Sequence, residues 1–220
     1  MDTLKRDTFF KEEKDMANKK YSIKDEFTMI TILTIPICVA VNVVGDQIVQ
    51  LLKLPIFLDV IGTILVGMLA GPWAGAVTGI LSNCVMGITD NPTLIPFAIT
   101  SASIGLAAGF FSRKDWFEPK KVWKIIVAVI VMDLLTICTA SPITIFAFGG
   151  VSGNGGQSVA IAGLMAAGSN IVSAVIGTDL WVNALDRAIG LVVAYAVIRV
   201  IPDRTLIKYA LGDKYTKKKA

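Results

Sequence analysis

The chain has 220 residues, of which 54% are hydrophobic and only 17% charged, with a mean hydropathy of +0.68 and a formal net charge of +4. Soluble domains usually carry about a quarter charged residues, and several apolar stretches between Phe27 and Ile201 are long enough to cross a bilayer as helices. The composition therefore excludes a soluble enzyme, a disordered protein and a secreted disulfide scaffold, and it predicts an all-α, polytopic membrane protein.

Six spanning helices are predicted in one bundle, because four prolines and one glycine-rich run interrupt the apolar sequence at five places. The predicted spans are Thr28–Leu51, Phe57–Ala70, Trp73–Ile88, Thr93–Ser112, Val122–Phe148 and Leu180–Ile201.

The basic residues predict the orientation. With six spans, 19 of the 21 Lys and Arg residues fall in the N-terminal segment, the central loop and the C-terminal end, and only Lys53 and Arg187 fall on the other side. By the positive-inside rule both termini are cytoplasmic. The chain then divides into an N-terminal tail (1–27), a transmembrane domain (28–204) and a basic C-terminal tail (205–220).

The stretch Gln157–Thr178 is apolar enough for a seventh span, but crossing there would place the basic C-terminus outside. Its Gly, Ser and Asn content favours a re-entrant segment or a surface hairpin on the outer side. An alternative is a lid that packs into the mouth of the bundle.

The sequence lacks the residues that several kinds of catalytic and metal-binding site require. The chain has no histidine, its three cysteines lie far apart in apolar segments, and it has no G-x-x-x-x-G-K-[ST] loop for ATP. We expect no enzyme activity, no metal site and no cofactor.

The strongest candidate for a functional site is one face of the last helix. Asp179, Asn183 and Asp186 are spaced by four and three residues, which places them together at its outer end. A structural salt-bridge network that includes Arg187 is the competing interpretation.

Other polar residues within apolar segments have two interpretations each. Asp59 either contacts a ligand or caps the second helix. Asn83 and Asp133 either serve a functional site or hydrogen-bond to neighbouring helices. Trp181 either stacks on a ring-shaped ligand or belongs to the aromatic belt.

Taken together, these residues predict an outer mouth that suits a small polar or aromatic solute. The candidate substrate-binding residues are Asp59, Asn83, Phe146, Asn154, Asp179, Trp181, Asn183 and Asp186.

Several segments resemble the substrate-binding (S) components of energy-coupling factor (ECF) transporters, and the resemblance runs from Phe27 to about Arg204. The segments that carry it are Leu54–Thr63, Gly71–Ala76, Pro96–Ala98, Ser141–Ile143, Phe148–Gly153, Leu185–Arg187 and Ile201-Pro202.

The resemblance implies a six-helix subunit in a bacterial cytoplasmic membrane that captures a water-soluble vitamin or its precursor. Its partners would be a transmembrane coupling subunit and two cytoplasmic ATPase subunits, which would drive uptake. Many members of this family dock through an Ala-x-x-x-Ala motif in the first helix. Here Ala40 is followed at that step by Val44, so Ala70, Ala74 and Gly75 are further candidates for docking.

A self-sufficient secondary transporter or channel for a small polar solute is the alternative function. Asp133 could carry a proton in such a carrier, although the sequence has no clear inverted repeat.

Overall fold

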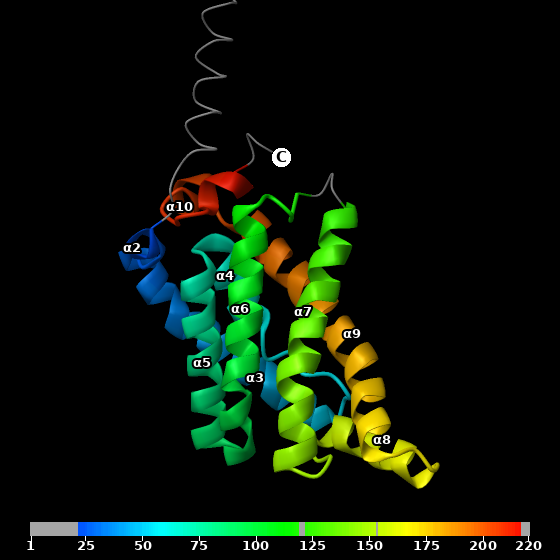
Figure 1. The fold of residues 1–220 in the computed structure, drawn as a ribbon. Coiled ribbons are helices and arrows are strands. Elements are labelled where there is room, and N and C mark those ends of the chain that lie inside the picture. The colour runs from blue at the N-terminus through cyan, green and yellow to red at the C-terminus, as the bar shows by residue number, and fades with distance from the viewer. Residues whose placement is uncertain (1–21, 119–121, 153, 217–220) are drawn as a thin grey trace, which may run out of the picture.

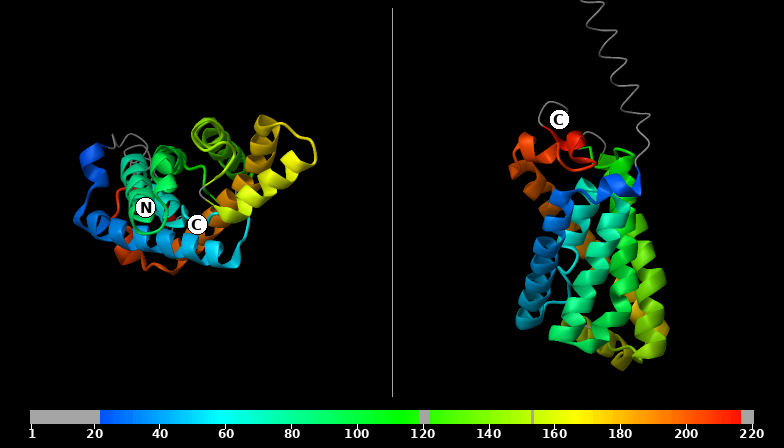
Figure 2. Two further views of the ribbon diagram at one scale, coloured as in Figure 1. Left: turned by 90° about the horizontal axis from the view of Figure 1, so that it is seen from below. Right: turned by 90° about the vertical axis from the view of Figure 1, so that its left-hand side faces the viewer.

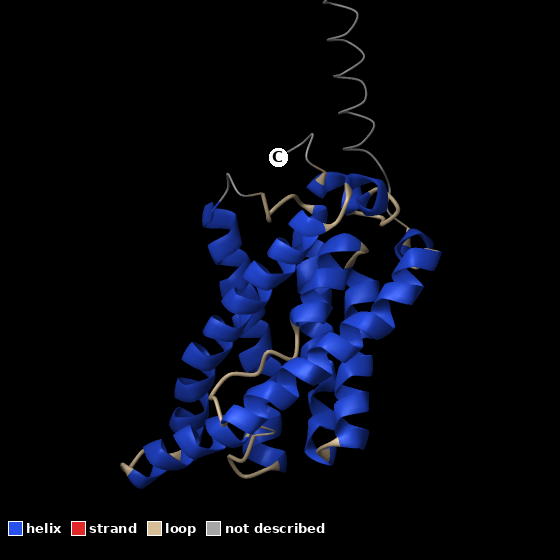
Figure 3. Ribbon diagram, turned by 180° about the vertical axis from the view of Figure 1, so that it is seen from behind, coloured by secondary structure: helices blue, strands red, loops and turns tan. Residues whose placement is uncertain are grey.

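The computed structural model describes residues 22–118, 122–152 and 154–216. Within these ranges every regular element is a helix and no strand occurs (Figure 3). The elements are α2 (Ile23–Glu26), α3 (Met29–Leu52), α4 (Ile61–Leu69), α5 (Pro72–Thr89), η1 (Pro92–Phe97), α6 (Ala98–Arg113), α7 (Val122–Pro142), η2 (Ile143–Ala147), α8 (Gly155–Ala166), α9 (Ile171–Val200), α10 (Asp203–Leu206) and η3 (Gly212–Tyr215).

Four helices are long and apolar enough to cross a membrane: α3, η1 with α6, α7 with η2, and α9. They correspond to the first, fourth, fifth and sixth predicted spans. The predicted third span, Trp73–Ile88, corresponds to α5, whose first position is Pro72 after Gly71. The described residues thus confirm the all-helical class and contain four candidate membrane-spanning helices, while the count of six spans and the cytoplasmic position of both termini stay predictions.

The second predicted span is shorter than expected. Instead of a helix over Phe57–Ala70, residues 53–60 form a loop and α4 begins only at Ile61. Nine residues of helix reach only about 14 Å, less than half of a hydrocarbon core. Residues 62–69 of α4 are all buried, and α4 contacts α3, α5, α6 and α9. Irregular backbone at membrane depth is tolerated when protein surrounds it, which explains how this segment avoids lipid.

The last helix begins earlier than predicted, at Ile171 instead of Leu180. The reason is local: Gly168 adopts a positive φ of 97° and ends the preceding segment, and the Asn170 side chain caps the new helix by accepting from the Ser173 amide at 2.9 Å. The stretch 157–178 therefore divides between α8 and the first two turns of α9. At 30 residues, or about 45 Å, α9 is long enough to cross the bundle obliquely (Figure 1).

The first and last described segments meet at one end of the bundle, and α8 lies at the opposite end (Figure 2). The Leu211 amide donates to the Leu69 carbonyl at 2.9 Å, and the hydroxyls of Thr34 and Tyr209 are 2.7 Å apart. Leu206, Tyr209 and Leu211 are buried. Residues 205–216, beyond the predicted domain boundary at 204, thus pack on the helices.

At the same end, Glu26 of α2 is fully buried and joins three elements. Its carboxylate accepts from the amides of Trp73 and Ala74, at 2.7 and 3.1 Å, and it forms an ion pair with Arg113 of α6. These amides are free because they begin α5.

Candidate substrate-binding site

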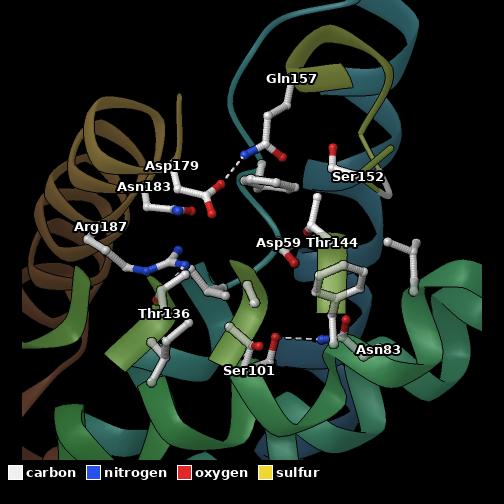
Figure 4. A pocket seen from close by; sticks show the side chains of 17 residues that line it. Asp59, Asn83, Ser101, Thr136, Thr144, Ser152, Gln157, Asp179, Asn183 and Arg187 are labelled. Atoms are coloured by element: carbon white, nitrogen blue, oxygen red, sulfur yellow. Dashed lines mark hydrogen bonds between the residues drawn. The ribbon is translucent and has the colours of Figure 1, made fainter. Parts of the chain in front are cut away.

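A cavity lies between α5, α6, α7 and α9 in the half of the bundle that α8 covers. Its volume is about 500 Å³, a figure that includes the open solvent at its mouth. Polar side chains reach it from several elements, as Figure 4 shows. The lining residues are Phe57, Asp59, Val60, Asn83, Leu94, Phe97, Thr100, Ser101, Ile104, Thr136, Ala140, Thr144, Ser152, Gln157, Asp179, Asn183 and Arg187.

One face of α9 supplies three of these side chains: Asp179, Asn183 and Arg187. They are spaced by four residues, so each lies about one helical turn from the next. All three are buried, with exposures of 3% or less. Two of the three, Asp179 and Asn183, are among the predicted candidates. The third lining residue, however, is Arg187 and not Asp186.

Asp179 is held in place by two neutral donors. The Ser141 hydroxyl of α7 and the Gln157 amide of α8 each donate to its carboxylate at 2.5 Å. Gln157 therefore connects α8 to the wall of the cavity. This contact agrees with the lid alternative for the stretch 157–178.

Asp186 lies behind the cavity wall and does not line it. Its carboxylate forms an ion pair with Arg187 and accepts the Leu58 amide at 2.7 Å, and the other terminal nitrogen of Arg187 donates to Thr136 at 3.2 Å. The salt-bridge network expected as the competing interpretation is therefore present. Arg187 belongs to that network and also lines the cavity.

Asp59 reaches the cavity from the loop between α3 and α4 (Figure 4). The residue before α4 is Val60, and no side chain caps that helix. The interpretation of Asp59 as a helix cap is therefore wrong. Within the described ranges, no other side chain forms a hydrogen bond or an ion pair with its carboxylate.

Asn83 of α5 lines the cavity and also joins two helices. Its side-chain amide donates to the Ser101 hydroxyl of α6 at 2.5 Å and to the Gly79 carbonyl at 3.3 Å. The hydrogen bond to a neighbouring helix is therefore present, and a role of Asn83 in substrate binding stays a prediction.

Three further candidates do not line the cavity. Asn154 caps α8 by accepting from the Gln157 amide at 3.1 Å, and it donates to the Ile56 carbonyl at 2.7 Å. Phe146 is 86% exposed and Trp181 is 44% exposed. Trp181 lies two residues from both Asp179 and Asn183, and a step of about 200° places it on the opposite face of α9.

The aromatic lining residues are Phe57 and Phe97, and Phe97 stacks on Phe148 with ring centroids 6.1 Å apart. Neither was a candidate, although both lie in segments that carried the family resemblance. Gln157 and Ser101 were also missed, because no spacing rule connects residues on different helices. Thr136 and Thr144 share one face of α7 and η2 with Asp133 by spacing but were not among the candidates. Arg187 could have been found by extending the four-residue step from Asp179.

The predicted docking residues separate in the structure. Ala40 is exposed on α3. Ala70, Ala74 and Gly75 are buried inside the bundle, so this conformation offers none of them to another subunit.

Comparison with known proteins places the chain in a family. No curated protein and no solved structure matches it. The sequence model of the family described as "ECF transporter, substrate-specific component" matches residues 30–198, well over half of the chain. The protein therefore belongs to the substrate-specific components of ECF transporters, which are membrane transport subunits.

Proposed function

We propose that the chain is the substrate-capture subunit of an ECF-type importer and binds a water-soluble vitamin or its precursor with high affinity. In this proposal the helices α3, α4, α5, α6, α7 and α9 form a multi-pass bundle in a bacterial cytoplasmic membrane. The observation that carries the proposal is the polar cavity in the half of the bundle opposite the terminal segments.

The distribution of basic residues along the sequence supports an outward-facing cavity. The helices α2 and α10, which lie near the two ends of the described chain, are together at the end of the bundle away from the cavity (Figure 1). If those ends are cytoplasmic, as the positive-inside rule predicts, the cavity faces the exterior. A site there can collect solute from outside the cell.

Two segments enclose the cavity on that side. The loop 53–60 contributes Asp59, and α8 contributes Gln157. The bond from Asn154 to the Ile56 carbonyl joins them to each other. Their separation would open a path for solute without any change within the long helices.

Transport across the membrane requires further subunits. The sequence has no Walker loop, so ATP would be hydrolysed by two cytoplasmic ATPases and the motion transmitted by a transmembrane coupling subunit. The family to which the chain belongs implies such partners.

The test combines binding with uptake. The purified chain, expressed in rich medium, is examined by native mass spectrometry for a co-purified small molecule, which is then offered to proteoliposomes with and without the coupling module. We expect a vitamin-sized mass, and uptake only with the module and ATP. Uptake by the chain alone that collapses with the proton gradient would instead support a secondary transporter.

A further inference from the structure

We propose that the substrate is a small organic cation whose positive charge is recognised by Asp59 with the help of Asp179. This inference rests on the proposed function and specifies the chemical class of the solute. It is based on the numbers of acidic and basic side chains around the cavity and on the apolar and aromatic residues that line it.

The cavity is lined by three ionisable side chains: Asp59, Asp179 and Arg187. The charge of Arg187 is offset, because its guanidinium is already paired with the buried carboxylate of Asp186, although its Nε has no hydrogen-bond partner among the described residues. A buried pair of this kind contributes little net charge to its surroundings. The two remaining ionisable lining residues, Asp59 and Asp179, are both acidic.

Among the described residues, neither carboxylate has a basic partner of its own. Asp179 accepts there from the neutral side chains of Ser141 and Gln157. The charged groups that act on Asp59 are Asp186, Arg187 and Asp46, two acids and the one base that is already paired. A carboxylate away from water is costly unless a cation or several donors satisfy it.

A third acidic side chain, that of Asp133, lies near the lining residues. Asp133 of α7 is 5% exposed, and one of its carboxylate oxygens has no hydrogen-bond partner among the described residues. Its charged neighbours are Arg187 and Asp179. The acids near the cavity thus outnumber the bases, and an anionic solute would meet repulsion from several directions.

The walls select an organic cation over a metal ion. Phe57, Phe97, Leu94 and Ile104 supply apolar and aromatic surface, and aromatic faces attract organic cations. In the part of the chain that the structure describes, no group of three or more His, Cys, Asp or Glu side chains is placed to hold a metal.

A separate observation indicates that a polar ligand completes the site. Thr100 is a lining residue and is 5% exposed, and its hydroxyl oxygen is buried without a hydrogen-bond partner in the described chain. Buried hydroxyls are rarely left in this state. A hydrogen-bonding group on the substrate would satisfy Thr100.

The experiment uses two series of probes in which the ring is constant and the charge varies at neutral pH. The first series is 3-(aminomethyl)pyridine, nicotinamide and nicotinate, and the second is pyridoxamine, pyridoxine and 4-pyridoxate. Dissociation constants are measured by titration calorimetry on the full chain in detergent. The molecule that co-purifies with the chain is measured in parallel, and its charge is determined once it is identified.

We expect the cationic member of a series, or a cationic co-purified molecule, to bind best. Asp59→Asn is nearly isosteric and should weaken its binding by about ten- to a hundredfold, the usual effect of losing a bond to a charged partner. Asp179→Asn should act in the same direction. Asp90→Asn changes an exposed acid of the same half of the bundle and should leave the affinity within about twofold, below 0.5 kcal/mol by the affinity relation.

Each other outcome is decisive. Preference for the neutral or anionic member, or a co-purified molecule without positive charge, overturns the inference and leaves the proposed function intact. Cation binding that survives both Asp59→Asn and Asp179→Asn overturns the assignment of these residues. A chain that binds neither a co-purified molecule nor any probe overturns the proposed function as well. If Asp59→Asn does not fold, the inference is tested by the affinity of Asp179→Asn and by the order in which the wild-type chain binds the cationic, neutral and anionic probes.

Discussion

The carboxylate of Asp186 on α9 accepts a hydrogen bond from the backbone amide of Leu58, at 2.7 Å, across 128 residues of sequence. Leu58 has a φ of 54°, which is unfavourable for a side chain branched beyond Cβ and needs compensation from its surroundings. Asp186 supplies that compensation. The last helix therefore fixes the loop that places Asp59 in the cavity.

Asp186→Asn should reduce the free energy of unfolding by about 3–5 kcal/mol, because it leaves Arg187 charged and buried without its partner. Equilibrium unfolding in mixed micelles, monitored by circular dichroism, measures the change. Equal stability of the variant and the wild type would contradict a contribution from this pair.

The matched control removes both charges. In Asp186→Asn/Arg187→Gln the guanidinium that would remain unpaired is absent, and replacing a whole buried pair is often close to neutral. The double variant should therefore recover most of the lost stability. If it is no more stable than Asp186→Asn alone, the loss comes from the bond to Leu58 and not from the uncompensated charge.

The dependence of this loop on Asp186 explains one limit of sequence analysis. Prolines and glycines predicted where helices end, since their effects are local. The length of α4 could not be predicted in this way, because residues 53–60 are held outside a helix by contacts with α9 and with Asn154. An apolar run that continues through Phe57 carries no sign of such distant partners.

The site was predictable where a single helix sets the geometry. The face of α9 followed from the helical repeat, and Asp179 and Asn183 were found on it. Residues that enter from other elements, such as Gln157 and Phe97, converge only through the packing of the bundle. Asp59 and Asn83 were found for a different reason, since polar side chains in apolar segments are conspicuous.

The aromatic residues of the site give a second prediction. Phe97→Ala removes a wall of the cavity and should weaken binding of the co-purified molecule by about tenfold, in line with one lost aromatic contact. Trp181→Ala alters a larger side chain on the opposite face of α9 and should leave the dissociation constant unchanged. Titration calorimetry compares the two, and a greater loss in Trp181→Ala would contradict the position of the cavity.

The close packing of α5 against α6 gives a third prediction. A Cβ atom on Gly105 would lie 2.3 Å from the backbone carbonyl carbon of Gly75, and backbone on both sides cannot yield as a side chain can. Gly105→Ala should therefore cost at least about 1–3 kcal/mol of folding free energy. Thermal unfolding in detergent should show a clear decrease in the midpoint.

Gly177 on α9 is the control for this substitution. A Cβ atom there would meet nothing within 4 Å, and alanine favours a helix over glycine by up to about 1 kcal/mol. Gly177→Ala should thus be neutral or stabilising. Destabilisation of both variants to the same degree would mean that close approach of α5 and α6 is not the cause.

The last prediction concerns the buried carboxyl of Glu26 at the terminal end of the bundle. Burial raises its pKa above the ordinary 4.5, and this effect outweighs the opposing contributions of the Ala74 amide, Arg113 and the Trp73 amide. The folded protein therefore keeps this proton to a higher pH than the unfolded chain does. In that interval the folded state binds more protons, so stability falls as the pH rises above about 4.5.

Glu26→Gln isolates this contribution, because glutamine cannot titrate and keeps an oxygen that accepts from the amides of Trp73 and Ala74. The difference in unfolding free energy, wild type minus variant, should be largest below pH 4.5 and decline toward neutral pH. The decline reflects the cost of ionising a carboxyl that Arg113 only partly compensates. A difference that increases with pH would show instead that the ion pair with Arg113 exceeds the cost of burial.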